Sequence, residues 1–461
     1  MSDQGLQQAR EKMEAAGVDP VAIDVFSHYY RLVESGETGM VPESSIEPLD
    51  MEALADVDVP DDAAREAIGT TVVIKLNGGL GTSMGMDRAK SLLEVRDGLS
   101  FIDVIARQVL ALRQQFDARL PLIFMDSFRT SADTMAALSP YADLAVDGLP
   151  LEFLQNKEPK LRADDLTPVT WEKDPDLEWC PPGHGDIYTA LRGTGLLEQL
   201  IDAGYTQAFV SNSDNLGAVP DARVAGWFAR SGAPFAIEAV RRTPSDRKGG
   251  HFATRKSDGR IVLRETAQTL EEDKEALADL SRHKYASTNN LWFNLEAMRD
   301  ELDRRDGILG LAMIKNTKTV DPADSSSPEV IQIETAMGAA IEVFDGATTI
   351  EVGRDRFVPV KTTNDLLVLR SDCYELSDGC VLEQQPEAIP FVDLDSEYYK
   401  LVAGFDERFP DGMPSMRAAS SLVVHGDWTF GKDVTVVGDV ELDAPSDGAG
   451  RVEPGTTLGE R

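Results

Sequence analysis

The sequence predicts an α/β fold with parallel strand pairs, followed by a C-terminal segment of parallel β-coils. Residues 71–74 form an apolar, β-branched run that is typical of a buried strand. Two further apolar runs, at 120–125 and 207–211, follow it with helical patterns between them. In the tail, apolar residues recur at a spacing of six. Strands that alternate with helices pair in parallel, and ligands bind beyond their carboxyl ends.

Helical patterns flank these strands. Near the N-terminus one helical face carries four apolar side chains: Ile23, Phe26, Tyr30 and Val33. Residues 36–62 are acidic and contain prolines with little periodicity, so we expect a linker there. A second helix is expected to start at Ser100, with Asp103 in capping-box position. We therefore predict an N-terminal helical segment with its linker at 1–62, a central α/β domain at 63–385 and a C-terminal domain at 386–461.

The tail shows two interleaved series of apolar residues. One series is Val424, Phe430, Val436 and Leu442, and the other is Trp428, Val434 and Val440. Glycines punctuate both series. This period favours the coils of a parallel β-helix over the alternative, an ordinary pair of hairpins.

The charge of the chain restricts its partners. The 461 residues include 80 acidic and 45 basic side chains, for a net charge of −35. A field of this sign repels phosphate backbones and argues against nucleic-acid binding. A polyphosphate site must then be a local positive pocket. Because the acidic residues are spread along the whole chain, we interpret them as a hydrated surface suited to high salt.

Cysteine content and hydropathy indicate the compartment. Cys180, Cys373 and Cys380 are too few for a disulfide framework, and no pair has CxxC spacing. A reducing compartment fits this content. The first residues lack the apolar core of a signal peptide, and no apolar run reaches the roughly 18 residues that span a membrane. We expect a cytoplasmic protein with no membrane partner.

A glycine-rich loop follows the first predicted strand and contains Asn77, Gly78 and Gly79. Glycine lets backbone N–H groups approach a nucleotide closely, and a tight turn is the alternative. The loop is not a dinucleotide fingerprint, since Met84 stands where a third glycine is required, and it lacks the Gly-Lys-Ser/Thr of a P-loop. Lys90 follows shortly after, either to neutralise phosphate oxygens or as a solvated lysine.

Further polar residues lie beside apolar runs. Asp214 ends a strand and suits Mg²⁺, unless it only caps a turn. His184 lies in a Pro-Pro-Gly-His turn and either donates to phosphate or binds nothing. Asn290 and Glu334 suit hydroxyl recognition, with satisfied buried polar groups as the alternative. Lys361 says little alone. The sequence has no Ser–His–Asp order, which fits phosphoryl-type transfer by positioning and charge neutralisation.

Together these segments resemble the eukaryotic-type UTP–glucose-1-phosphate uridylyltransferases, or UDP-glucose pyrophosphorylases, from about Thr71 to the tail. Six motifs occur in the family's order: LNGGLGTSMG at 76–85, PPGHGDIY at 181–188, VSNSDNLGA at 210–218, TNNLW at 288–292, VIQIETAMGAAI at 330–341 and FVPVKTTNDLL at 357–367. The resemblance implies a Rossmann-like nucleotidyltransferase core with a mixed, mostly parallel sheet at 63–385. It also implies a C-terminal left-handed parallel β-helix at 386–461.

The resemblance also implies roles for individual residues. The UTP site would comprise Leu76, Asn77, Gly78, Gly79, Lys90, Met125, Gln155, Gly183, Asp214 and Lys361, with Gln155 and Gly183 at the uracil edge. The sugar phosphate would be held by His184, Asn212, Ser213, Asn290 and Glu334, the last two at the glucose hydroxyls. Asp214 would also ligate Mg²⁺. Lys90, Lys361 and Asp214 would be the catalytic residues.

Two departures from the family pattern stand out. Met86-Asp87-Arg88-Ala89 replaces the usual Cys-Lys-Gly-Pro before Lys90, so the loop loses a lysine. The last strands of the β-helix look shortened before Arg461, so we expect a monomer or weak oligomer.

The implied activity is Mg²⁺-dependent formation of UDP-glucose and pyrophosphate from UTP and glucose 1-phosphate. The same chemistry with galactose 1-phosphate or an N-acetylhexosamine phosphate is the alternative, and the pocket near Asn290 and Glu334 would decide. A catalytically silent nucleotide-sensing subunit is disfavoured because Lys90, Asp214 and Lys361 are all present. Met84 disfavours a dinucleotide-dependent oxidoreductase.

Overall fold

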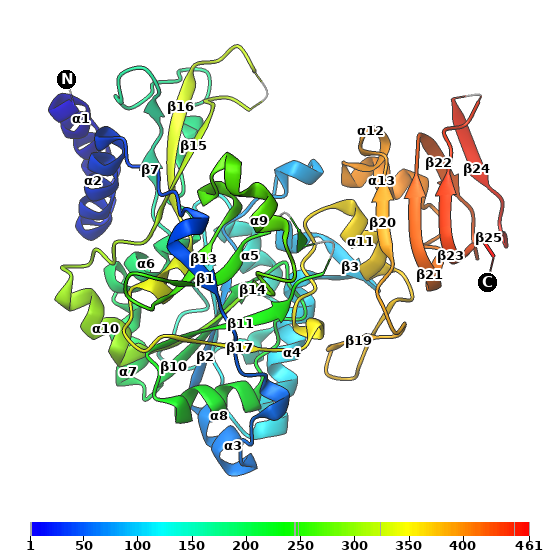
Figure 1. The fold of residues 1–461 in the computed structure, drawn as a ribbon, viewed down its shortest axis with the longest axis horizontal. Coiled ribbons are helices and arrows are strands. Elements are labelled where there is room, and N and C mark those ends of the chain that lie inside the picture. The colour runs from blue at the N-terminus through cyan, green and yellow to red at the C-terminus, as the bar shows by residue number, and fades with distance from the viewer. Residues whose placement is uncertain (1, 244–245, 248, 323, 447, 461) are drawn as a thin grey trace.

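A seven-stranded sheet forms the centre of the molecule in the computed structural model, which describes residues 2–460 except 244–245, 248, 323 and 447 (Figure 1). Its strand order is β17-β11-β14-β10-β2-β5-β6. The strands are β2 Thr71–Leu76, β5 Leu122–Asp126, β6 Glu152–Leu154, β10 Gln207–Asn212, β11 Phe235–Arg241, β14 Tyr285–Asn294 and β17 Thr348–Glu351. Only β14 is antiparallel to its neighbours in this sheet, so the predicted mixed, mostly parallel sheet is confirmed.

Helices cover both faces of this sheet because alternate residues of each buried strand point to opposite sides. Val73 and Phe209 pack with one face, and Val72 and Val210 with the other. The first face carries α3 Asp61–Gly69, α4 Phe101–Phe116 and α8 Ala222–Ser231. The second carries α6 Ile187–Gly193, α7 Leu196–Asp202 and α10 Leu295–Arg304.

The predicted start of α4 is confirmed. Ser100 Oγ accepts from the Asp103 N–H at 3.3 Å, and the Asp103 carboxylate accepts from the Ser100 N–H at 2.8 Å. This reciprocal capping box satisfies two N–H groups that the first helical turn leaves unpaired. The apolar face of α4, which is Phe101, Ile105, Val109 and Leu112, is buried.

Two N-terminal helices, α1 Ser2–Ala15 and α2 Pro20–Ser35, pack outside the central sheet. The predicted face of α2 is buried against a three-stranded sheet made of β8 Leu161–Arg162, β15 Met313–Thr319 and β16 Glu329–Thr335. This packing matters for the site because β16 carries Glu334.

The segment predicted as a linker is more ordered than expected. Residues Ile46–Pro48 form β1, which pairs antiparallel with β12 His251–Arg255, and β12 pairs in turn with β13 Ile261–Arg264. The side chain of Ile46 is fully buried. A single apolar residue among acidic and proline residues gives no periodicity, so the sequence pattern could not show this strand.

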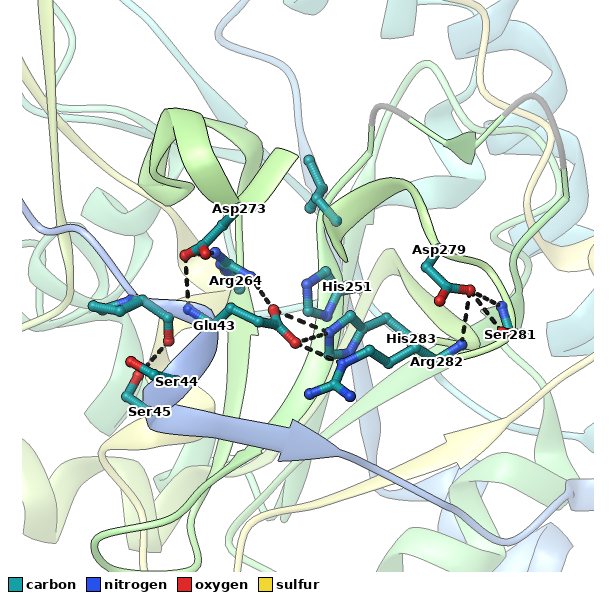
Figure 2. Close-up of polar contacts among 12 residues, drawn as sticks. Glu43, Ser44, Ser45, His251, Arg264, Asp273, Asp279, Ser281, Arg282 and His283 are labelled. Carbon is teal, nitrogen blue, oxygen red and sulfur yellow. Dashed lines mark hydrogen bonds and ion pairs between the residues drawn. The ribbon is translucent and has the colours of Figure 1, made fainter. Parts of the chain in front are cut away.

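A partly buried ionic cluster fixes the same segment to the core (Figure 2). The Glu43 carboxylate contacts Arg264 at 2.6 Å, Arg282 at 2.7 Å and His283 at 3.0 Å. The His283 ring stacks on His251 with ring centroids 3.7 Å apart. We call these five residues the Glu43 cluster. They attach residues 36–62 to the central α/β domain.

In the C-terminal segment the strands pair in parallel. One sheet has the order β20-β21-β23-β25 and a second pairs β22 with β24. The strands are β20 Phe391–Leu394, β21 Ser415–Val424, β22 Asp427–Phe430, β23 Thr435–Leu442, β24 Ala449–Val452 and β25 Thr457–Leu458. Hairpins would pair antiparallel, so this alternative is wrong here. The segment projects from one side of the molecule, with the C-terminus at its far end (Figure 1).

Shorter elements connect these parts. The helices are α5 Ser131–Leu138, α9 Lys274–Ala278, α11 Thr363–Arg370, α12 Ser396–Tyr399 and α13 Val402–Arg408. The strands are β3 Glu94–Arg96, β4 Leu99–Ser100, β7 Glu158–Pro159, β9 Trp179–Cys180, β18 Tyr374–Leu376 and β19 Leu382–Gln384. All three cysteines are free thiols. None of the helices in the described part of the chain combines the length and the apolar character needed to cross a bilayer.

Candidate active site

The glycine-rich loop leaves the carboxyl end of β2 and is held there through Asn77. The Asn77 backbone N–H donates to Met125 O at 2.8 Å, and its Nδ2 donates to Asp126 Oδ1 at 2.9 Å and Thr134 Oγ1 at 2.8 Å. Ser213 Oγ donates to Asn77 Oδ1 at 2.9 Å. The side chain of Asn77 is thus fully engaged by protein groups. Asn77 therefore positions the loop, and its backbone is what remains to meet a ligand.

Gly78 lies so close to Gln155 that any Cβ at this position would overlap the Gln155 amide. By contrast, a Cβ at Gly79 would point into open space. The side chain of Gln155 is nearly buried. Gln155 directly follows β6, and its backbone N–H donates to Asp126 O, at the end of the neighbouring strand β5, at 2.8 Å. The structure therefore brings together the loop and the predicted uracil-edge glutamine. Leu76 and Met125 are paired on the adjacent strands β2 and β5.

Lys90 and Asp214 meet in an ion pair of 2.7 Å although they lie on separate segments. Lys90 Nζ also donates to Val360 O at 2.5 Å, and the Val360 N–H donates to Asp214 O at 3.0 Å. The backbone bond from Lys90 N–H to Gly79 O, at 3.2 Å, folds this lysine back beneath the glycine loop. Both side chains keep about a fifth of their surface exposed, 18% for Lys90 and 23% for Asp214. The pair is therefore accessible to a substrate.

Lys361 directly follows Val360, so its backbone lies beside this ion pair while its side chain is exposed. The Lys361 N–H donates to Asp365 Oδ2 at 2.8 Å, and Asp365 completes a capping box at the start of α11. Burial raises the pKa of Glu265 and the Lys361 ammonium partly offsets this rise, so these two side chains lie close enough to interact. Asn212 ends β10 in register with Leu76, and Ser213 follows it at the same edge.

The loop departure from the family pattern faces solvent. Asp87 and Arg88 are both exposed, whereas the flanking Met84 and Ala89 are buried. The Ala89 N–H donates to the Asp133 carboxylate at 3.2 Å. Because Asp87 is exposed, the loss of the family's lysine at this position changes the charge on the solvent side of the loop.

His184 is held in one tautomer by the backbone. The Met337 N–H donates to His184 Nδ1 at 2.9 Å, so the ring proton lies on Nε2. Burial lowers the pKa of His184 to about 4, which keeps the ring neutral at physiological pH. The ring can thus donate one hydrogen bond from Nε2. This suits a phosphate or hydroxyl oxygen.

The turn that carries His184 packs on the end of β16. Gly183 has φ +82°, in the left-handed region that favours glycine, and its Cβ position would meet the backbone of Thr335. The Thr335 N–H donates to Pro182 O at 2.9 Å. Glu334, the preceding residue, is half-buried and lies 3.8 Å from Lys318. The structure thus brings Gly183, His184 and Glu334 together.

Asn290 lies deeper than expected, with a fully buried side chain. Its Nδ2 donates to Glu238 Oε2 at 3.0 Å. Its Oδ1 is buried and has no protein partner among the described residues, so one acceptor is left open there. Strand β14 is irregular at this point, with a register shift opposite residue 238 and φ +56° at Asn289. Such bulges re-aim side chains beside functional sites.

Several supporting residues were missed by the sequence analysis. Asp126 anchors Asn77, Glu238 holds Asn290, and Arg356 pairs with Glu238. Asp126 ends β5 as Asp214 follows β10, and this shared strand-end position could have identified it. Glu238 and Arg356 lie 118 positions apart, and no sequence spacing joins them.

Lys75 is also a missed residue, buried in β2 beneath the loop. Its Nζ donates to Ser211 Oγ at 2.8 Å and to Ala218 O at 2.7 Å. Burial, together with the nearby Arg356, lowers the pKa of Lys75 to about 7. Its two bonds join β2 to β10 and to the loop after Asp214.

The described residues contain no group of three or more His, Cys, Asp or Glu side chains that could hold a metal ion. A dedicated protein cage is therefore absent from the described ranges. Mg²⁺ takes one or two carboxylates and completes its shell with water and substrate phosphate oxygens. The partly exposed carboxylate of Asp214 beside the loop fits this second type of site.

Comparison with known proteins agrees with the family resemblance of the sequence motifs. Residues 23–437 match the family model for UTP–glucose-1-phosphate uridylyltransferase. The potato protein of that name is 36% identical over 449 residues, which cover 94% of this chain and 91% of the potato chain. The protein of that name from Saccharomyces cerevisiae is 39% identical over 372 residues, covering 80% of this chain and 72% of the yeast chain.

Solved structures agree with the sequence comparison. A variant UDP-glucose pyrophosphorylase from Leishmania major, in complex with UDP-glucose, superposes with a TM-score of 0.92 at 41% identity and covers 98% of both chains. The UDP-glucose phosphorylase of Trypanosoma brucei gives 0.91 at 41% identity, covering 99% of this chain and 98% of its own. By sequence and by fold, this chain belongs to the UTP–glucose-1-phosphate uridylyltransferase family.

Proposed function

We propose that this protein joins UTP and glucose 1-phosphate to form UDP-glucose and pyrophosphate. The observation that carries the proposal is the pairing of Lys90 with Asp214 beneath the glycine loop, with Lys361 next to it. In this proposal two cationic side chains and one carboxylate would serve the point where two anionic substrates must meet. A protein that only binds a nucleotide has no need of this set.

The reaction requires little covalent chemistry from the protein. The phosphate oxygen of glucose 1-phosphate attacks the α-phosphorus of UTP in line, a new P–O bond forms, and pyrophosphate leaves with the electron pair of the broken bond. The nucleophile is already an anion, so no general base is needed. The protein must hold two anions together and neutralise their charge. We assign this work to Lys90, Lys361 and Asp214.

Mg²⁺ would be held by Asp214 and would withdraw charge from the phosphate oxygens. Lys90 stays paired with Asp214 until phosphate arrives, so it is pre-positioned at the loop. Lys361 then bridges the two substrate phosphates from its exposed position. The Nε2–H of neutral His184 would donate a hydrogen bond to the sugar phosphate, because its Nδ1 is occupied by the Met337 N–H.

Substrate recognition follows the architecture of the site. Leu76, Asn77, Gly78 and Gly79 would wrap the nucleotide by backbone contact, with Gln155 and Gly183 at the uracil edge and Met125 beneath. Asn212 and Ser213 would lie between nucleotide and sugar phosphate. Glu334 and the open Oδ1 of Asn290 would meet glucose hydroxyls, and the latter needs a donor because it is buried without a protein partner among the described residues.

Other features belong to this proposal. The parallel coils at 386–461 would close as a left-handed β-helix, and the protein would act as a monomer or weak oligomer. Its free thiols fit a cytoplasmic enzyme. The dispersed acidic surface would keep it hydrated at high salt.

The test is pyrophosphate release by the purified protein with Mg²⁺, UTP and glucose 1-phosphate, at low and molar salt. We expect release that requires both substrates and the metal and that prefers glucose 1-phosphate. Parallel reactions contain galactose 1-phosphate or N-acetylglucosamine 1-phosphate. Preference for either would overturn the glucose assignment. UTP binding without turnover of any sugar phosphate would indicate the silent subunit.

A further inference from the structure

Glu238 is a fully buried carboxylate at the centre of the molecule, and all of its oxygen sites are used. Oε1 accepts from Trp292 Nε1 at 2.9 Å and from Arg356 Nη2 at 2.6 Å. Oε2 accepts from Asn290 Nδ2 at 3.0 Å and from Arg356 Nε at 2.6 Å. Four donors on two oxygens, two of them from one planar guanidinium, fix the geometry of every group involved.

One side of this carboxylate faces the proposed sugar site. The Asn290 amide nitrogen must point at Glu238, because a carboxylate only accepts, so Oδ1 points the other way. Oδ1 is the buried acceptor without a partner in the described part of the chain. Thr288 Oγ1 also donates to Glu238 O at 2.8 Å, so Glu238 holds both ends of the irregular turn in β14.

The other side of the carboxylate leads to the phosphate site. Arg356 opens the segment that runs to Lys361, and its carbonyl accepts from Asn215 Nδ2 at 3.1 Å. Asn215 Oδ1 in turn accepts from the Val358 N–H at 2.8 Å. Two residues on, the Val360 N–H donates to Asp214 O. The segment from 356 to 361 is thus held by hydrogen bonds to the loop that carries Asp214.

We propose that Glu238 is a positioning residue that ties Asn290, at the sugar, to the segment carrying Lys361, at the phosphates. Occupancy of the sugar pocket and placement of the bridging lysine are then coupled through one rigid carboxylate. This inference rests on the proposed function, since it takes the roles of Asn290 and Lys361 from it. It adds a residue that touches neither substrate.

The matched control is another glutamate–arginine pair in the same sheet. Glu351 of β17 accepts from Arg241 of β11 at 2.7 and 3.1 Å, and Arg241 lies three residues beyond Glu238 on the same strand. The Arg241 side chain is 62% exposed, and the pair contacts none of the proposed site residues. Glu351→Gln therefore repeats the chemical change of Glu238→Gln without the proposed link.

The experiment compares steady-state kinetics of Glu238→Gln, Arg356→Lys and Glu351→Gln with the native enzyme. We expect KM for glucose 1-phosphate to rise and kcat to fall by about 10-fold or more in the first two, with KM for UTP changed less than about 3-fold. Arg356→Lys keeps the positive charge but loses the bidentate hydrogen bonds to Glu238. It therefore tests the proposed connection between Asn290 and Lys361 even if Glu238→Gln folds poorly. Glu351→Gln should match the native enzyme. Unchanged kinetics, or equal rises in KM for both substrates, would overturn the proposal.

Coupling is measured directly by a double-mutant cycle. The effects of Asn290→Ala and Lys361→Ala on kcat/KM should be non-additive by at least about 3-fold in the native background and additive in Glu238→Gln. Additivity in both backgrounds would overturn the coupling. If Asn290→Ala and Lys361→Ala each impair catalysis while Glu238→Gln does not, the positioning role alone fails. If neither single variant has an effect, the proposed function of the site fails instead.

Discussion

The Glu43 cluster and the Lys90–Asp214 pair are both ionic groups in a strongly acidic chain, and they are built in opposite ways. Glu43 meets Arg264, Arg282 and His283, and Arg264 has no exposed side-chain surface (Figure 2). Lys90 and Asp214 meet each other and remain partly exposed. Charges that are satisfied by several fixed protein groups hold the fold together. Charges that keep an accessible side can exchange a protein partner for a substrate.

The largest effect is expected at the accessible pair. Asp214→Asn should reduce kcat by about 10²–10³-fold, because the reaction loses the carboxylate that positions Lys90 and Mg²⁺. Lys361→Ala should reduce turnover by at least about 10²-fold for the same electrostatic reason. The measurement is initial-rate pyrophosphate release at saturating substrates. Near-native turnover in either variant would contradict the assigned role.

In the Glu43 cluster the expected loss is in stability. Glu43→Gln should lower the free energy of unfolding by about 2–3 kcal/mol, because buried Arg264 is left without one of its two carboxylates. The loss should be smaller than for a fully buried pair, because Glu43 keeps some exposure. Urea denaturation measures this change. Asp50→Asn, which breaks the exposed Lys284 pair near the same segment, is the control and should have no measurable effect. Equal stability of the two variants would remove the contrast between the clusters.

Lys75 should give a smaller, pH-dependent effect. Its pKa is about 7 in the folded chain against an ordinary value of 10.5, so the unfolded chain binds more protons between these values. Stability from this group therefore rises with pH from 7 to 10.5 and is lost as pH falls through the same window. Urea midpoints at pH 7 and pH 10 should show this rise in the native protein, relative to Lys75→Met. Parallel pH dependence in both proteins would disprove the shift.

The smallest effect concerns the mouth of the loop. Asp87→Lys exchanges one exposed acidic side chain for a basic one without touching Lys90. We expect kcat/KM for UTP to rise by about 2- to 3-fold at low ionic strength and to return to the native value in molar salt, because the gain is a screened attraction. Asp202→Lys, at the exposed end of α7, is a matched control for added charge. An identical gain in the control would assign the effect to net charge alone.

The sequence patterns pointed to the groups that we propose face the substrates and missed the residues that support them, and the reason is geometric. Asp214 and Asn77 follow apolar strands, so strand ends marked them directly. Glu238 and Lys75 lie inside strands among apolar residues. A charged side chain there interrupts the apolar pattern, but the sequence does not indicate which residue it pairs with. Their partners, Arg356 and Ser211, are more than a hundred residues away. Only the folded sheet brings these pairs together.

The fold shows the same division. The parallel strand pairs and the capped helix α4 could be predicted because they depend on local periodicity and capping, whereas the mixed character of the sheet was implied only by the family resemblance. Strand β1 could not, since its one buried side chain, Ile46, gains its environment from β12, about two hundred residues later. The buried position of Asn290 likewise depends on the irregular pairing of β14 with β11.

The place of β14 in the sheet sets the order in which the molecule can be completed. In the described sheet, β14 lies between β11 and β10, so β11 and β17 can join the rest of the sheet only after β14 is in place. Strand β14 starts only at Tyr285. During synthesis, more than seventy residues must be added after β10 ends before β14 can pair with the exposed edge of β10. Contacts so distant along the chain form slowly, and uncovered strand edges invite association with other chains. We therefore expect refolding from denaturant to be slow and to lose yield as protein concentration rises.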